Sequence, residues 1–170
     1  MSLLKTSLLA FACLLLSPTV YAAENWKGKA QIPPFEAGLM TGFAIYGSST
    51  NWGVLASGAF LINDQGFADE VDDRLWIEVQ AGPVFFGTAT SSQTGLQYST
   101  HLRWDFTMNE YWTFYGLGGL GGYSLPSSMG NSFTIHPRFG AGAEYQTKTA
   151  LLFRGEVSAE FIGMGIAFNF

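Results

Sequence analysis

The last nine residues of the chain alternate between large apolar side chains and small or polar ones. Ile162, Met164, Ile166, Phe168 and Phe170 share one parity, whereas glycine, alanine and asparagine fill the other. Successive side chains of a β-strand point to opposite faces. The pattern therefore predicts a strand with one strongly apolar face. A two-residue period recurs in seven earlier stretches, and no stretch has the period of an amphipathic helix.

Eight strands are predicted in total. They span residues 36–47, 52–61, 74–86, 95–106, 111–123, 133–145, 149–159 and 162–170. The first begins after Pro33 and Pro34, because proline does not fit inside a paired strand. The longest connection, 62–73, is acidic, and the others are short. This succession of hairpins predicts a single all-β domain.

The amino terminus has the features of a secretory signal peptide over residues 1–22. Lys5 precedes an apolar run, and Val20-Tyr21-Ala22 ends in a small residue before the expected cleavage point. Cys13 lies within the apolar run and does not fit a lipoprotein signal, so the mature chain is expected to lack cysteine. Residues 23–35 are then a periplasmic lead segment, and residues 36–170 form the β domain. Seven basic and thirteen acidic residues remain without Lys5, which argues against nucleic-acid binding.

Three properties favour a membrane-spanning barrel over a soluble β-sandwich. The predicted strands are 9–13 residues long, whereas strands of soluble proteins usually have about 5–6 residues. Charged residues make up only 12% of the chain. Aromatic residues lie near strand ends, as in the two interfacial belts of outer-membrane barrels. The belt residues are expected to include Trp52, Trp104, Trp112, Tyr123 and Tyr145.

The carboxy-terminal third also resembles a known family. The segments Pro137–Tyr145 and Leu152–Glu156, followed by the glycine-spaced ending at Phe170, look like small OmpA/OmpX-type barrels. The resemblance implies an eight-stranded antiparallel up-and-down transmembrane β-barrel in the outer membrane of a Gram-negative cell. It also implies contact with lipid, including lipopolysaccharide, and Phe168 and Phe170 as the signal for the barrel-insertion machinery. We expect the barrel to be a monomer. The chain departs from the family pattern because its longest connection falls on the periplasmic side.

Charged residues of the predicted strands share the parity opposite to the apolar faces, which is the lumen side of a membrane barrel. An eight-stranded barrel is just wide enough for side chains to fill it, so we expect a charge network that largely plugs the lumen. The expected members are Glu78, His101, Arg103, Asp105, His136, Arg138, Glu144, Arg154 and Glu156. This predicts a structural or surface-interaction role; a porin-like small-solute or ion pore is the alternative.

A lipid A-modifying hydrolase is a further alternative, because Ser99, His101 and Asp105 share one strand face. At about 3.4 Å per residue, however, Asp105 lies roughly 14 Å from His101. Glu78 or Glu144 would have to orient the imidazole instead. No metal-ligand spacing surrounds the two histidines, and no helix follows the glycines of 116–122 to make a phosphate loop. We therefore expect no enzymatic activity, no cofactor and no metal.

Overall fold

The computed structural model describes residues 33–46, 49–67, 72–87, 92–125 and 132–170. The predicted signal peptide and nearly all of the predicted lead segment lie outside these residues. The strands are β1 (Phe35–Tyr46), β2 (Ser49–Asn63), β3 (Asp73–Gly87), β4 (Ser92–Thr107), β5 (Trp112–Ser124), β6 (Phe133–Gln146), β7 (Leu151–Ser158) and β8 (Phe161–Asn169). β1 begins directly after Pro34, one residue before the predicted boundary.

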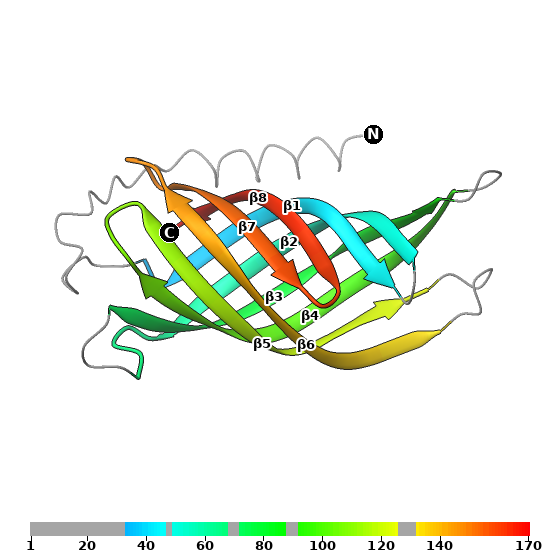
Figure 1. The fold of residues 1–170 in the computed structure, drawn as a ribbon, viewed down its shortest axis with the longest axis horizontal. Helices are drawn as coiled ribbons and strands as arrows, with labels where there is room; N and C mark the ends of the chain where they lie inside the picture. The colour runs from blue at the N-terminus through cyan, green and yellow to red at the C-terminus, as the bar shows by residue number, and fades with distance from the viewer. Residues whose placement is uncertain (1–32, 47–48, 68–71, 88–91, 126–131) are drawn as a thin grey trace, which may run out of the picture.

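The eight strands form one closed antiparallel barrel in chain order, as predicted (Figure 1). β1 closes the barrel against β8, with Phe43 opposite Ile162 and Gly42 opposite Gly163. A Cβ atom on Gly42 would lie 2.2 Å from the Ile162 carbonyl oxygen, so the two backbones meet where only glycine fits. The terminal Phe170 amide donates to the Phe35 carbonyl at 2.8 Å. The seam therefore extends to the end of the chain.

Apolar residues occupy both parities of the predicted strand 52–61, including Leu55 and Leu61. Leu55 is buried inside the barrel, whereas Trp52 and Phe60 face outward. The pairing of β2 with β3 shifts between Leu61 and Asn63. The parity continues through this shift, since Phe60 and Ile62 are both exposed. Apolar residues occur on both faces of β2 because part of the lumen is itself apolar and contains Leu55.

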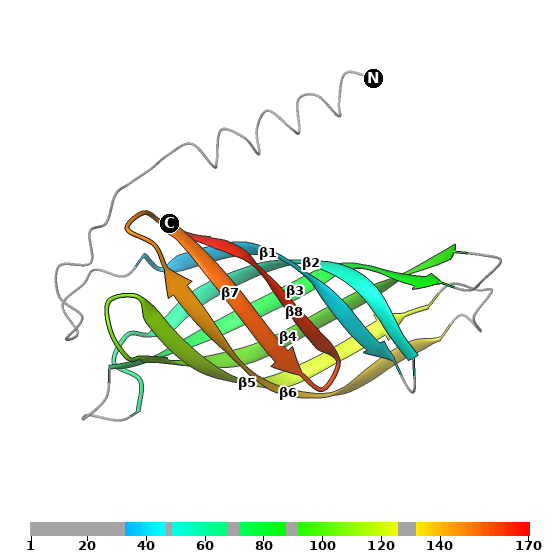
Figure 2. The same cartoon turned by 45° about the horizontal axis from the view of Figure 1, so that its top comes forward.

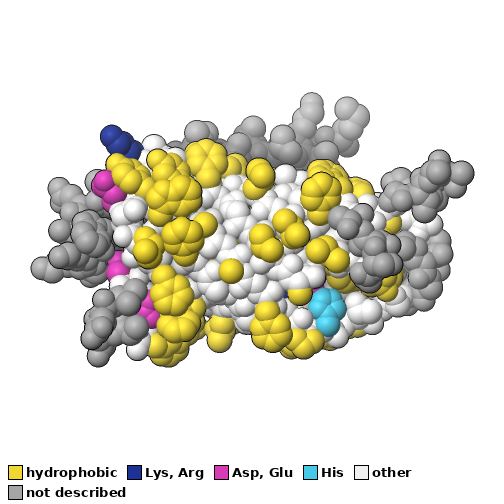
Figure 3. Space-filling model, viewed as in Figure 1, with side chains coloured by type: hydrophobic (Ala, Val, Ile, Leu, Met, Phe, Trp, Pro, Cys, Tyr) yellow, Lys and Arg dark blue, Asp and Glu magenta, His cyan; other side chains and the backbone are white. Residues whose placement is uncertain are grey.

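The barrel has the inverted polarity of a membrane protein. Its exposed large apolar side chains include Leu39, Leu102, Phe139 and Met164, while its buried interior contains arginine and glutamate. Figure 3 shows apolar side chains over the wall, and most of the visible charged ones near one end. Because the barrel is closed, the backbone N–H and C=O groups are hydrogen-bonded along most of the wall, as the hydrocarbon core of a membrane requires. The described residues include no helix of the length and hydropathy that membrane crossing needs.

The β7–β8 hairpin is shorter than its neighbours. Gly140 pairs with Ser158, and Ala159 donates its amide to the Phe139 carbonyl. Residues 133–138 of β6 therefore extend past the β7–β8 turn, which Figures 1 and 2 show ending well before the adjacent strands. The Ser158 hydroxyl fixes this turn by contacting both the amide and the carbonyl of Phe161.

An apolar cluster fills part of the lumen. Phe86, Tyr123 and Leu125 lie near the ends of their strands, on the side opposite the carboxy terminus, and Tyr46 packs against the cluster. The remaining members are Met40, Ala44, Leu55, Val84 and Phe161. The lumen thus combines this apolar cluster with a charged region.

Candidate functional site

Arg103 is the centre of the charged region of the lumen. Its side chain is fully buried on β4 and contacts Glu36 at 2.8 Å, Glu78 at 3.2 Å, Asp105 at 2.9 Å and Glu144 at 3.0 Å. These carboxylates come from β1, β3, β4 and β6. One guanidinium therefore ties together strands from around the barrel. Hydrogen bonds to charged groups of this kind are stronger than neutral ones.

Arg154 extends the network to β7. Its Nη1 atom lies 2.8 Å from Glu78 Oε1, and its Nη2 atom lies 3.1 Å from Glu156 Oε2. Its Nε atom donates to the Tyr115 hydroxyl at 2.8 Å, while the Tyr115 ring lies under the guanidinium, 4.8 Å from ring centroid to Cζ. Glu78 therefore bridges two arginines, and Tyr115 contacts one of them by both its hydroxyl and its ring.

Arg138 forms the third centre. It contacts Glu156, donates to Gln80 Oε1 at 2.8 Å and lies 3.0 Å from Glu160 Oε1. His136 Nε2 lies 3.2 Å from the other oxygen of Glu160. Burial raises the pKa of the Glu160 carboxyl, in the β7–β8 turn, above its ordinary value, and the positive charge of Arg138 opposes this shift.

The structure places eight of the nine predicted lumen residues fully inside the barrel, and His136 lies partly exposed at its rim. Sequence reasoning missed Glu36 and Glu160, which both belong to the network. Glu36 shares the inward parity of Met40 in the same strand, so this acid was recognisable from the sequence. Glu160 lies in the two-residue link between β7 and β8, where strand parity gives no prediction.

Tyr123 is not a belt residue, and that prediction was wrong. It is 2% exposed, and its hydroxyl lies 3.0 Å from the carbonyl oxygens of both Ile45 and Glu160. The parity of β5 explains the error, because Tyr115 and Leu117 are buried and Tyr123 shares their face. The intervening glycines concealed this parity in the sequence. Trp52, Trp104, Trp112 and Tyr145 are exposed on the outer wall.

Two glycines of β5 leave space for lumen side chains. A Cβ atom on Gly121 would meet the Glu160 carboxylate at 2.2 Å, and one on Gly119 would lie 2.6 Å from the Cβ atom of His101. The glycine-rich part of β5 is therefore a recess that accommodates charged groups from β4 and from the β7–β8 turn.

The three residues that suggested a hydrolase do not form a triad. Ser99 Oγ lies 3.5 Å from His101 Nδ1, and His101 Nε2 lies 3.8 Å from Glu78. Asp105 instead contacts Arg103. The Ser99 oxygen also accepts a hydrogen bond from Arg138 at 2.6 Å and is buried within the lumen. A nucleophile must reach its substrate, and lipid chains contact the opposite side of the wall.

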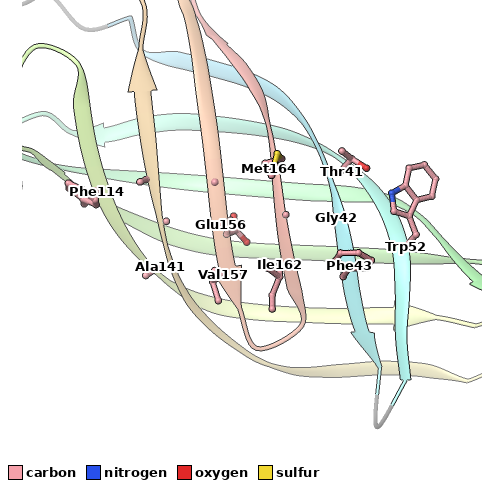
Figure 4. Close-up of a pocket in the computed structure, with 14 residues that line it drawn as sticks. Thr41, Gly42, Phe43, Trp52, Phe114, Ala141, Glu156, Val157, Ile162 and Met164 are labelled. Atoms are coloured by element: carbon pink, nitrogen blue, oxygen red, sulfur yellow. The ribbon is translucent and has the colours of Figure 1, made fainter.

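The outer wall carries a shallow apolar groove of about 780 Å³ (Figure 4). Ala141, Val157 and Ile162 line its central part, and Phe114 and Trp52 belong to its outer parts. Its lining residues come from β1, β2 and β5–β8. Within the described ranges, no set of three or more His, Cys, Asp and Glu residues is arranged to hold a metal ion.

Comparison with known proteins identified similar folds. No protein-family model matches the chain, and no curated protein matches it. A crystal structure of Ail, the attachment invasion locus protein of Yersinia pestis, is 15% identical with a TM-score of 0.48, covering 79% of this chain and 95% of Ail. A backbone structure of the Yersinia pestis outer membrane protein Ail in a phospholipid bilayer nanodisc is 17% identical, with a TM-score of 0.48, covering 79% and 99%. Ail in complex with the heparin analogue sucrose octasulfate gives 15% identity and a TM-score of 0.47, covering 79% and 95%.

The closed antiparallel topology, the apolar outer wall and the charged interior together define the class of protein. In hydrocarbon a β-structure must close so that its backbone is paired, and a polar interior under an apolar exterior is the arrangement of outer-membrane barrels. The chain is therefore an eight-stranded antiparallel β-barrel with the apolar outer wall and polar interior of a transmembrane barrel.

Proposed function

We propose that this protein is a structural component of the outer membrane that is closed to solutes and interacts with its surroundings through its surface. The observation that carries the proposal is the filling of the lumen. Arg103 and Arg138 are completely buried, and Phe86 and Tyr123 are nearly so. An open aqueous channel would expose the side chains that line it.

The connections between strands limit the kind of surface interaction that we propose. Residues 47–48, 88–91 and 125–132, which connect β1 to β2, β3 to β4 and β5 to β6 in the sequence, contain no lysine or arginine. Serine, threonine and glycine are frequent in them. Binding of a sulfated or phosphorylated polymer generally uses clusters of basic residues. We therefore propose contacts through neutral polar groups, and no polyanion as the partner.

The wall supports contact with membrane lipid. The groove of Figure 4 is lined by apolar residues from six strands, and acyl chains are the groups that fill such a surface inside a bilayer. A single chain forms the closed barrel and encloses its own polar side chains, so we propose that the protein is a monomer. We also propose that the protein is not an enzyme, because Ser99 is buried among its hydrogen-bonding partners.

A conductance measurement tests the proposal against the small-solute or ion pore. The purified barrel is reconstituted into planar bilayers, and we expect no single-channel events. The matched positive control replaces Tyr46 and Phe86 by alanine, which removes an edge-to-face pair with centroids 6.2 Å apart from the apolar cluster. This variant is expected to conduct more often than the wild type. Regular openings of the wild-type barrel would refute the closed lumen and support the pore.

A further inference from the structure

The lumen contains more acidic than basic groups. Among the described residues, its network contains three guanidiniums, those of Arg103, Arg138 and Arg154. They face six buried carboxylates, from Glu36, Glu78, Asp105, Glu144, Glu156 and Glu160. With both histidines neutral, six negative and three positive charges leave a formal charge of −3. Water and salt screen such an excess at a surface but screen it much less in a buried site.

Both histidines of the network stand beside carboxylates. His101 Nε2 lies 3.8 Å from Glu78, and His136 Nε2 lies 3.2 Å from Glu160. Arg103 also contacts Glu78, and Arg138 also contacts Glu160, so each histidine experiences both signs of charge.

The excess is concentrated around Arg103. Glu36, Asp105 and Glu144 all contact this guanidinium, from β1, β4 and β6. Glu144 Oε1 lies 3.0 Å from Arg103 Nη1 and 3.8 Å from Arg154 Nε, yet it accepts no well-aligned hydrogen bond. Carboxylates that share one site cannot all ionise freely, and one of them retains a proton. Of the three, Glu144 is the one with a buried carboxylate oxygen that accepts no hydrogen bond.

A proton fits this place better than a metal ion does. The carboxylate oxygens around Arg103 already accept its N–H groups, at 2.8–3.0 Å for Glu36 and Asp105. The described residues provide no cluster of acidic, histidine or cysteine side chains arranged for a metal. A proton requires no additional volume and no coordination sphere.

We propose that the lumen is a proton-binding site in which Asp105 and Glu144 share one proton at neutral pH. The charged and titratable groups that face this pair are Glu36, Glu78, Arg103, Arg154 and Tyr115. The unfolded chain does not hold this proton at neutral pH, so raising the pH destabilises the folded barrel. Burial also raises the pKa of the Glu160 carboxyl, which likewise makes the folded barrel less stable as the pH rises.

Urea unfolding of the full barrel in lipid vesicles, measured from pH 6 to pH 9, tests this linkage. Each proton that only the folded state retains changes the folding constant by about tenfold per pH unit. We expect the stability to fall as pH rises, and Glu144→Gln to have a shallower slope. The matched control is Glu110→Gln in the exposed β4–β5 connection. A flat wild-type profile, or equal slopes for the two variants, would overturn the proposal.

Infrared spectroscopy provides a second measurement if the Glu144→Gln variant does not assemble. The folded wild-type barrel at neutral pH is expected to show the carbonyl stretch of a protonated carboxylic acid, which shifts in D₂O and disappears at high pH. Absence of this band refutes the shared proton. Unfolding is repeated with added Mg²⁺, and a midpoint set by the metal concentration rather than by pH would also refute it. Conductance is measured separately, so failure of the closed-lumen function is distinguishable from failure of this proposal.

Discussion

Single side chains in the lumen connect strands that are distant in the sequence. Tyr123 reaches from β5 to the end of β1 and to the β7–β8 turn, where its hydroxyl lies 3.0 Å from two carbonyl oxygens. The neighbouring part of β6 has no β7 residue beside it, because β7 ends at Ser158. Tyr123 therefore stabilises the wall at the place where strand pairing stops.

Replacing Tyr123 by phenylalanine tests this role. The ring is retained, so the apolar cluster keeps its packing, but the Ile45 and Glu160 carbonyls lose the Tyr123 hydroxyl, and the Glu160 carbonyl keeps the Ile45 amide at 2.8 Å. A lost buried hydrogen bond costs about 1–3 kcal/mol, and we expect the urea midpoint of the reconstituted barrel to decrease accordingly. Tyr145→Phe, on the outer wall, is the matched control and should change little. Equal effects of the two substitutions would show that the Tyr123 hydroxyl is not important.

Arg103→Met tests the centre of the network. Removal of one partner leaves the buried carboxylates of Glu36, Asp105 and Glu144 without their main counter-charge, and breaking buried pairs costs about 3–5 kcal/mol. We expect a large loss of the compact, heat-modifiable form in gel electrophoresis. Lys148→Met, in the exposed β6–β7 connection, serves as the control. Recovery of Arg103→Met to wild-type levels would contradict the central role of this arginine.

Strand parity was the most informative property of the sequence at the level of elements. It predicted all eight strands and placed Arg103, Arg138 and Arg154 on the inward face, because large apolar residues marked the lipid face clearly. It failed at Tyr123, where glycines on both faces of β5 removed the contrast. It also gave no information on Glu160, since a turn has no alternation. Pairing partners across the lumen depend on register, which local sequence does not determine.

The closing strand β8 carries the next prediction. The Phe170 amide donates to the Phe35 carbonyl, and the two rings lie with centroids 5.9 Å apart. We propose that Phe168 and Phe170 form the assembly signal, so deletion of Phe170 should reduce the fraction of protein inserted in the outer membrane. Phe153→Ala, an outward residue of β7, controls for loss of an aromatic ring. Normal insertion of the shortened chain would disprove the assignment.

The whole molecule separates its charges by region. The interior holds Arg103, Arg138, Arg154 and their carboxylates, the wall is apolar, and the sequences that connect β1 to β2, β3 to β4 and β5 to β6 lack basic residues. This distribution supports the proposal of a closed structural barrel. The conductance experiment tests whether the barrel is permeable, and the pH experiment tests whether its lumen retains a proton. Either proposal can be refuted without refuting the other.

The charge network has a consequence for the accuracy of folding. A strand that slips by two residues still presents apolar groups to lipid and polar groups to the lumen, so the alternating pattern does not detect the error. The slip displaces every side chain by about 6.8 Å along the strand, far beyond the 2.8–3.2 Å contacts that join Arg103 to Glu36 and Glu78. The ion pairs of Arg103, Arg138 and Arg154 therefore form together only when β1, β3, β4, β6 and β7 are in the correct register, and they select this register over a slipped one.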